Sequence, residues 1–423
     1  MKLKAYPAYK DSGVEWLGHV PIQWVVDRLK HSMKSCKNGI WGDEPQNDEN
    51  DIPCVRVADF NRNHLTVLLT EPTIRNVTKK EQSSRLLNKG NLLLEKSGGG
   101  ENQPVGCVVL YEDTKPAVCS NFVAKIELAD GMVPSFWRYL HATAYSIRLT
   151  VGSINQTSGI QNLDQDRYFN ERSTFPSTAE QVSIARFLDH ETSKLDNLIA
   201  KQEHLIELLQ EKRQAIISIA VTKGLNADAK MKDSGVPWLG KVPVSWKVLQ
   251  FRHMASIQNG SDYKHIENED GDYPVIGSGG EFRRATDYIY DGVSVLLGRK
   301  GTIDKPLFIE GKFWVVDTMF YTIIKNIVIP KFVFNCAKII PFDLLSTSTA
   351  LPSMTQNDLK ALYFALPPTI EEQNAITEYI DTQTEKIDTL IDKAKHSIEL
   401  AKEHRTALIS AAVTGKIDVR EYV

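Results

Sequence analysis

Apolar residues recur at helical spacing in two long stretches of the chain. The first stretch runs from about residue 177 to Gly224, and the second runs from about residue 369 to Gly415. Neither stretch contains an internal proline or glycine, and a glycine just past the last periodic residue commonly ends a helix. The pattern therefore predicts two α-helices of about 40 residues, each roughly 60 Å long at 1.5 Å per residue.

Proline and a capping residue mark the start of each predicted helix. Pro176 precedes Thr178, and Pro367 and Pro368 precede Thr369. Each threonine is followed within three residues by Glu or Gln, which resembles a capping box. We therefore expect Thr178 and Thr369 to cap the two helices.

Helices of this length need a packing partner, and apolar residues at seven-residue spacing predict that they pack on each other. Small residues in the second helix would allow a close approach. The charged remaining faces are either a solvated surface or a docking site for other subunits. The predicted packing positions are Leu188, Leu195, Leu198, Leu205, Leu209 and Ile216 in the first helix, and Ile380, Ile387, Ala394, Ala401 and Leu408 in the second.

Short apolar runs between polar turns predict buried strands in the rest of the chain. Examples are residues 91–94, 105–110, 293–297 and 313–316. The expected fold is mixed α/β, with two globular domains and two long helices. We place the first domain at residues 1–173, its helix at 174–228, the second domain at 229–365 and its helix at 366–423.

The chain contains an internal duplication. The segment KDSGVEWLGHVPIQW at residues 10–24 returns as KDSGVPWLGKVPVSW at 232–246, an offset of 222 positions. The helical segment 181–222 returns at 373–414, an offset of 192. Identical pairs include Ile184/Ile376, Asp189/Asp381, Thr192/Thr384, Lys194/Lys386, Asp196/Asp388, Leu198/Leu390, Arg213/Arg405 and Thr222/Thr414. The flanks match and the middles do not, which predicts two modules with the same frame and different contents; the first is about 30 residues longer.

Glycine-rich polar loops follow the predicted strands of both modules. Glycine allows a close approach to phosphate, Lys and Arg neutralise charge or bind guanine, and Asn and Gln can recognise adenine. A plain tight turn is the alternative for each loop. The candidate DNA-binding residues are Lys37, Asn38, Lys96, Ser97, Gly98, Gly99, Asn102 and Gln103 in the first module, and Asn259, Ser278, Arg283, Arg284, Arg299, Lys300 and Thr302 in the second.

The repeated tryptophans Trp16, Trp24, Trp238 and Trp246 fit core packing of an extended arm better than stacking on bases. The ten histidines and five cysteines show no metal-ligand spacing, so we expect no metal site and free, buried thiols. Walker, dinucleotide-binding and nucleophile-elbow motifs are also missing. We therefore predict no catalytic residues in this chain.

The net charge of −3 is unusual for a DNA-binding protein, where a basic excess is typical. Either the positive charge is local or partner subunits supply most phosphate contacts. The first residues lack the apolar core of a signal peptide, and no apolar run approaches the ~18 residues of a membrane span. We therefore expect a cytoplasmic protein.

The doubled D-S-G-V-x-W-L-G-x-V-P-x-x-W arms, the doubled helix starts and the doubled A-x-x-S-x-A-V-T endings resemble the specificity subunits of type I restriction–modification enzymes. The resemblance covers nearly the whole chain. It implies two target-recognition domains separated by an antiparallel helical spacer, each recognising one half of a split DNA site. It also implies two adenine methyltransferase subunits and two restriction subunits as partners. S-adenosylmethionine, ATP and Mg²⁺ would bind to those partners and none to this chain, which has no N-P-P-[YF] or D-P-P-[YF] motif.

Two alternatives remain open from the residues alone. A self-contained methyltransferase or nuclease would need a cofactor or metal motif. A scaffold that only joins proteins would have modules without basic polar loops, and Lys96, Arg299 and Lys300 count against it.

Overall fold

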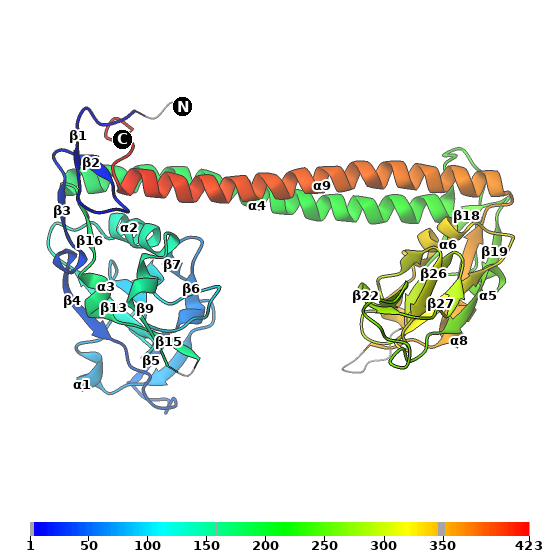
Figure 1. Ribbon diagram of the computed structural model, residues 1–423, viewed down its shortest axis with the longest axis horizontal. Coiled ribbons are helices and arrows are strands. Elements are labelled where there is room, and N and C mark those ends of the chain that lie inside the picture. The colour runs from blue at the N-terminus through cyan, green and yellow to red at the C-terminus, as the bar shows by residue number, and fades with distance from the viewer. Residues whose placement is uncertain (1–3, 158, 346–351, 423) are drawn as a thin grey trace. The chain divides into compact units, whose positions relative to one another are not determined.

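The chain forms two compact units in a computed structural model that describes residues 4–157, 159–345 and 352–422. Unit 1 comprises Met1–Lys201 and Ser397–Val423, and unit 2 comprises Gln202–His396. The long helices α4 (Thr178–Lys223) and α9 (Ile370–Val413) each contribute one half to each unit (Figure 1). The expected mixed α/β fold with two long helices is confirmed.

Unit 1 places a mixed α/β module before α4. Its elements are β1 (Tyr9–Asp11), β2 (His19–Pro21), β3 (Val25–Arg28), β4 (Met33–Asn38), β5 (Asp51–Val55), β6 (Phe60–Asn61), β7 (Thr66–Val67), β8 (Thr73–Asn76), α1 (Lys79–Gln82), β9 (Leu92–Glu95), β10 (Ser97–Gly98), β11 (Val108–Leu110), β12 (Val118–Cys119), β13 (Val123–Leu128), α2 (Pro134–Ser146), β14 (Ile154–Thr157), β15 (Ile160–Leu163), α3 (Gln165–Phe169) and β16 (Arg172–Phe175).

Unit 2 places a second module between α4 and α9. Its elements are β17 (Met231–Asp233), β18 (Lys241–Pro243), β19 (Lys247–Gln250), α5 (Phe251–Met254), β20 (Ala255–Asn259), β21 (Tyr273–Gly277), β22 (Gly280–Ala285), β23 (Tyr290–Asp291), β24 (Ser294–Gly298), β25 (Leu307–Ile309), β26 (Lys312–Val315), β27 (Met319–Ile324), α6 (Pro330–Ala337), α7 (Phe342–Leu345), α8 (Gln356–Ala361) and β28 (Tyr363–Leu366).

The sheets repeat the duplication that the sequence shows at its flanks. The order β4-β13-β9-β11 in unit 1 corresponds to β20-β27-β24-β25 in unit 2, and the pairs β1-β2 and β16-β3 correspond to β17-β18 and β19-β28. Strand β13 begins 90 residues after β4, whereas β27 begins 64 residues after β20. Most of the extra length of the first module therefore lies between these strands.

The four apolar runs form strands, as predicted. Strands β9, β11, β24 and β26 fall within or overlap them, and the side chains of β9 and β24 are all buried. Unbroken apolar runs suit strands that are covered on both faces. The core of each module forms around them, with Leu92, Leu94 and Val108 in one core and Val295, Leu297 and Phe320 in the other.

The caps of the long helices differ in one case from the prediction. Helix α4 begins at Thr178, so Ser177 is its cap: the backbone N–H of Glu180 donates to Ser177 Oγ. In α9 the cap is Thr369 as expected, because its Oγ1 accepts the backbone N–H of Glu372 over 3.2 Å. The sequence Ser177-Thr178 offers two capping hydroxyls in a row, and the sequence pattern alone selected the wrong one.

The helices α4 and α9 lie side by side within each unit, as the green and red ribbons of Figure 1 show. In unit 1 Leu188 and Thr192 of α4 are buried, and Leu195 and Ile199 further along the helix are half-buried. In unit 2 Leu209 packs against Ile387 and Ile391, with Ile206 and Ile216 beside them. These spacings alternate between three and four residues, as in a coiled coil. The other predicted packing positions Ile380, Ala394, Ala401 and Leu408 are buried.

Two of the predicted packing positions are wrong. Leu198 is 40% exposed and Leu205 is 41% exposed, whereas the adjacent Ile199 is half-buried and Ile206 packs beside Leu209. The sequence has two consecutive apolar residues at each place. Neighbouring residues on a helix point about 100° apart, so only one of each pair can enter the seam, and the heptad of Leu188 and Leu195 selects the isoleucine.

Each arm is anchored to a long helix by the same hydrogen bond. The indole Nε1 of Trp24 donates to Glu180 Oε1 over 3.1 Å in unit 1, and that of Trp246 donates to Glu372 over 2.9 Å in unit 2. The side chains of Trp24 and Trp246 are buried, so core packing is confirmed for these two, whereas Trp16 and Trp238 are half-buried. Because a buried indole N–H needs an acceptor, the glutamate fixes where each arm lies on its helix.

The long helices are also cross-linked by a repeated ion pair. Arg405 Nε lies 3.1 Å from Asp196 in unit 1, and Arg213 Nε lies 3.2 Å from Asp388 in unit 2. Both partners recur at the offset of 192 found in the sequence.

Among the residues that the structure describes, no helix has the length and apolar character that a membrane span needs.

Candidate nucleic-acid interface

Two predicted loops of the first module meet in the folded chain. Lys96 Nζ donates a hydrogen bond to Asn38 Oδ1 over 2.7 Å, and Gln165 Nε2 donates to the same oxygen over 3.0 Å. Beside them Ser97 Oγ donates to Asn162 over 2.6 Å. Lys37 and Asn38 are exposed at the end of β4. The structure therefore gathers Asn38, Lys96 and Ser97 into one polar surface.

The next part of this loop is a tight turn at two glycines. Gly98 and Gly99 have φ values of +115° and +63°, and a Cβ at Gly99 would lie 2.9 Å from the backbone nitrogen of Val105. The tight-turn interpretation therefore accounts for Gly99. Asn102 and Gln103 are exposed and line a pocket together with Arg62 and Glu95.

An ion pair between the half-buried Arg62 and the buried Glu95 lies at the start of this loop. Arg62 Nη2 lies 2.8 Å from Glu95 Oε2, and only 2% of the Glu95 side chain is exposed. Burial raises the pKa of Glu95, and the neighbouring Arg62 opposes that rise. Glu95 is the last residue of β9, so the pair fixes the point where the loop leaves the sheet.

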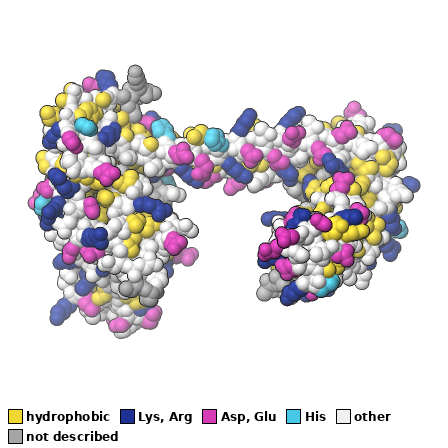
Figure 2. All heavy atoms as spheres, in the orientation of Figure 1, with side chains coloured by type: hydrophobic (Ala, Val, Ile, Leu, Met, Phe, Trp, Pro, Cys, Tyr) yellow, Lys and Arg dark blue, Asp and Glu magenta, His cyan; other side chains and the backbone are white. Residues whose placement is uncertain are grey.

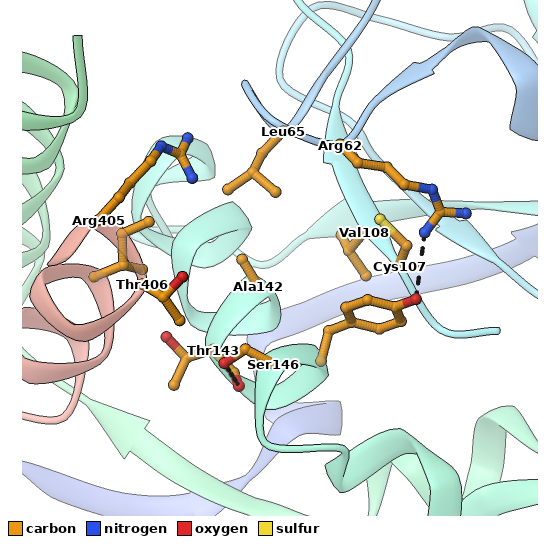
Figure 3. Close-up of a pocket in the computed structure, with 11 residues that line it drawn as sticks. Arg62, Leu65, Cys107, Val108, Ala142, Thr143, Ser146, Arg405 and Thr406 are labelled. Carbon is orange, nitrogen blue, oxygen red and sulfur yellow. Dashed lines mark hydrogen bonds between the residues drawn. The ribbon is translucent and has the colours of Figure 1, made fainter. Parts of the chain in front are cut away.

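Arg62 also lines a small pocket within unit 1 (Figure 3). In that view Arg62 and Arg405 lie on opposite sides, with Ala142 and Thr143 of α2 between them. The pocket has a volume of about 150 Å³, whereas small-molecule sites usually have about 300–1,000 Å³. We assign no ligand to it.

The second module presents its predicted loop after β24. Arg299 is half-buried, and its Nη1 donates to the carbonyl oxygen of Asp317 over 3.1 Å. Lys300 and Thr302 are exposed. The Arg299 guanidinium is therefore positioned by this hydrogen bond to the backbone, and its other N–H groups could donate to a ligand.

The arginines of the β21–β22 hairpin are engaged within their own module. Arg284 donates to the carbonyl oxygens of Gly271 and Asp272 and pairs with Glu281, and Arg283 pairs with Glu267 over 3.0 Å. Ser278 is half-buried at the tip of this hairpin. These contacts make Arg284 a structural residue and leave Arg283, which is 57% exposed in its side chain, as the better DNA candidate.

Sequence reasoning missed two glutamines. Gln165 contacts Asn38, and Gln356 Nε2 donates to Asn259 Oδ1 over 2.9 Å. Each is the first residue of a short helix, α3 or α8, and the two lie 191 positions apart. That offset is close to the one of the long helices, so extending the alignment of the two copies upstream of the helices would have found them.

Charge on the candidate surfaces is mixed in sign. Figure 2 shows Lys and Arg side chains interspersed with Asp and Glu on the visible face of both modules and along the long helices. In the part of the chain that the structure describes, no group of three or more His, Cys, Asp or Glu side chains is arranged to hold a metal ion. The five cysteines are free, and four of them are buried.

Comparison with known proteins connects this architecture to one family. Residues 243–400 match the sequence model of the type I restriction modification DNA specificity domain. The type I restriction enzyme EcoDI specificity subunit of Escherichia coli is 24% identical over 183 residues, which are 42% of this chain and 40% of that protein. The chain therefore spans well under half the length of this curated relative.

Two solved structures share the fold. One comes from work titled as the structural basis of complex assembly and conformational transition of the type I R-M system; it has a TM-score of 0.73 and 14% identity, covering 93% of this chain and 98% of that one. The other is the HsdS subunit from Thermoanaerobacter tengcongensis, with a TM-score of 0.55 and 14% identity, covering 94% and 98%.

In its duplicated modules and paired long helices, this chain is similar to specificity subunits of type I restriction–modification systems. The match to the family model itself lies in residues 243–400, which include most of the second module and most of α9.

Proposed function

We propose that this chain is a non-catalytic DNA-recognition subunit in which each module recognises one half of a bipartite, asymmetric site. The observation that carries this proposal is the duplicated frame with unequal contents. The arm tryptophans and the helix ion pairs repeat, while the loops after β9 and β24 differ in length and in residues. Two modules with the same docking contacts and different loops suit two different DNA sequences.

We further propose that the chain acts in the cytoplasm with two adenine methyltransferase subunits and two restriction subunits. S-adenosylmethionine, ATP and Mg²⁺ would bind to these partners, and none of them to this chain. Exposed leucines support a partner that is present twice, because Leu198 and Leu208 recur as Leu390 and Leu400 at the offset of 192, and all four are 40–51% exposed. Exposed apolar side chains that repeat in this way are candidate contacts.

The test of the proposed function is a map of methylated adenines in the host genome. We expect a motif of two short defined halves separated by an undefined spacer, and we expect it to disappear when this chain is deleted. Restoring the chain on a plasmid should restore the motif. A methylation pattern that does not change on deletion would contradict the proposal.

Arg299→Ala is expected to weaken recognition of one half-site only, by about 1–3 kcal/mol at one base pair, because a planar guanidinium suits guanine. The exposed Lys300 in the same loop and Lys96 in the first module are expected to contact phosphates instead, so their replacement should weaken binding to any sequence. Binding of the complex to duplexes substituted one half at a time measures both effects.

The control for Arg299→Ala is Lys402→Ala, since Lys402 forms an exposed ion pair with Glu399 on α9, outside the modules. If both variants bind DNA equally well, the loop after β24 is only a turn.

A further inference from the structure

Two amide pairs occupy equivalent places in the two modules. Gln165 Nε2 donates to Asn38 Oδ1 over 3.0 Å in unit 1, and Gln356 Nε2 donates to Asn259 Oδ1 over 2.9 Å in unit 2. Each asparagine is the last residue of an edge strand, β4 or β20, in the corresponding sheets. This is a polar contact outside the long helices and arms that both modules keep.

A glycine after each asparagine fixes the backbone at the pair. A Cβ at Gly39 would lie 2.1 Å from the carbonyl oxygen of Cys119, and a Cβ at Gly260 would lie 2.0 Å from that of Val316. Only glycine fits so close to another backbone. The end of the strand is therefore fixed against the neighbouring backbone in both modules, and this fixes the backbone position of the asparagine.

The free groups of each pair are donors. In both pairs the asparagine oxygen already accepts the glutamine amide, and within the described residues no hydrogen bond involves Asn38 Nδ2 or Asn259 Nδ2. Both asparagines are exposed. An amide nitrogen has two N–H donors and no acceptor, so each pair presents hydrogen-bond donors to the solvent.

A lysine lies beside each pair. Lys96 Nζ donates to Asn38 Oδ1 over 2.7 Å in unit 1, and Lys360 Nζ donates to Gln356 Oε1 over 2.7 Å in unit 2. The two lysines come from different elements, the loop after β9 and helix α8. Unpaired N–H donors next to an ammonium group are complementary to an anionic oxygen.

We propose that these two amide pairs, each with its lysine, bind DNA phosphates. The proposal rests on the proposed function. A feature that both modules share cannot distinguish two different half-sites, whereas phosphates are common to every DNA sequence. The pairs would set the register of each module on the backbone, and the unequal loops after β9 and β24 would contact the bases.

The decisive variants are Asn38→Asp and Asn259→Asp in the full chain assembled with its methyltransferase partner. Aspartate has nearly the same shape and keeps the oxygen that accepts the glutamine amide, but it replaces the free donor with an anionic oxygen. We expect each variant to lower the affinity for the cognate duplex and for an unrelated duplex by the same factor, roughly 10- to 100-fold. The factor should be smaller at ~200 mM than at ~50 mM salt, because salt screens the repulsion.

Asn357→Asp is the matched control for the second module. It makes the same charge change on the exposed residue next to Gln356, and we expect less than a twofold effect, small against the tenfold step that corresponds to about 1.4 kcal/mol. Lys360→Met gives an independent measurement that leaves the amide pair intact. It should reduce the slope of log affinity against log salt by about one.

Unchanged DNA binding by Asn259→Asp would overturn the proposal, and the pair would then only hold strand β20 against helix α8. A loss confined to one base pair of one half-site would also overturn it, since the pair would then contact a base. These results are distinct from failure of the proposed function, in which the wild-type complex itself would show no preference for a split site.

Discussion

Replacing Gly415 with alanine is expected to lower the free energy of unfolding of unit 1 by about 3 kcal/mol. Gly415 ends α9 with a φ of +74°, and a Cβ there would lie 2.4 Å from Pro21 Cδ and 3.0 Å from Trp24 Cζ3. Trp24 is fully buried and bonded to Glu180, so it cannot move aside without losing packing. Denaturant unfolding of the full chain, followed by tryptophan fluorescence, measures the loss.

Gly235→Ala is the matched control. Its φ is +72°, and a Cβ there would meet no atom within 4 Å. It should lose only the backbone cost of the left-handed conformation, about 1–2 kcal/mol. Equal losses in the two variants would mean that the close contact of Gly415 with the first arm contributes nothing to stability.

Arg62→Met is expected to destabilise unit 1 by about 3 kcal/mol near pH 8, because it leaves the buried carboxylate of Glu95 without a partner. Burial raises the pKa of Glu95 and Arg62 opposes this, so the variant should raise that pKa further. A carboxyl group whose pKa is raised on folding binds its proton more tightly in the folded state. Its contribution is therefore favourable below the unfolded pKa and is lost as the pH rises through the folded pKa.

The stability penalty of Arg62→Met should accordingly shrink as the pH falls from about 8 to about 5. Glu95→Gln in the Arg62→Met background is the control, because a neutral amide needs no cation. We expect the double variant to regain part of the lost stability near pH 8 and to lose the pH dependence. A penalty that stays the same across this range would show that Arg62 acts through packing alone.

The helices illustrate how far sequence patterns reach. Their existence, length and pairing follow from heptad spacing and from the glycines at 224 and 415, and these features are confirmed. The choice between Leu198 and Ile199, or between Leu205 and Ile206, does not follow. Both residues of each pair are apolar, and only the position of the facing helix decides which one is less exposed.

For the candidate DNA-binding residues, too, the sequence indicated some features and only the fold decided others. Lys96 and Asn38 were both singled out by local composition, but 58 positions separate them, and only the pairing of β4 with β13 and of β13 with β9 brings them together. Arg284 is a residue type that often contacts DNA, yet its guanidinium donates hydrogen bonds to the backbone carbonyl oxygens of Gly271 and Asp272. Local sequence indicates which hydrogen-bonding side chains are present, but it does not indicate which groups in the folded chain bond to them.

The sequence by itself determined the duplication, the mixed α/β class and the long helices, because repeats and periodicity are properties of the chain order. The tertiary structure decided which side chains meet across long separations. It paired Trp24 with Glu180, Arg62 with Glu95, and Asn38 with Gln165. Such contacts depend on how strands and helices pack in three dimensions, and for residues far apart in the chain local spacing carries no information about that packing.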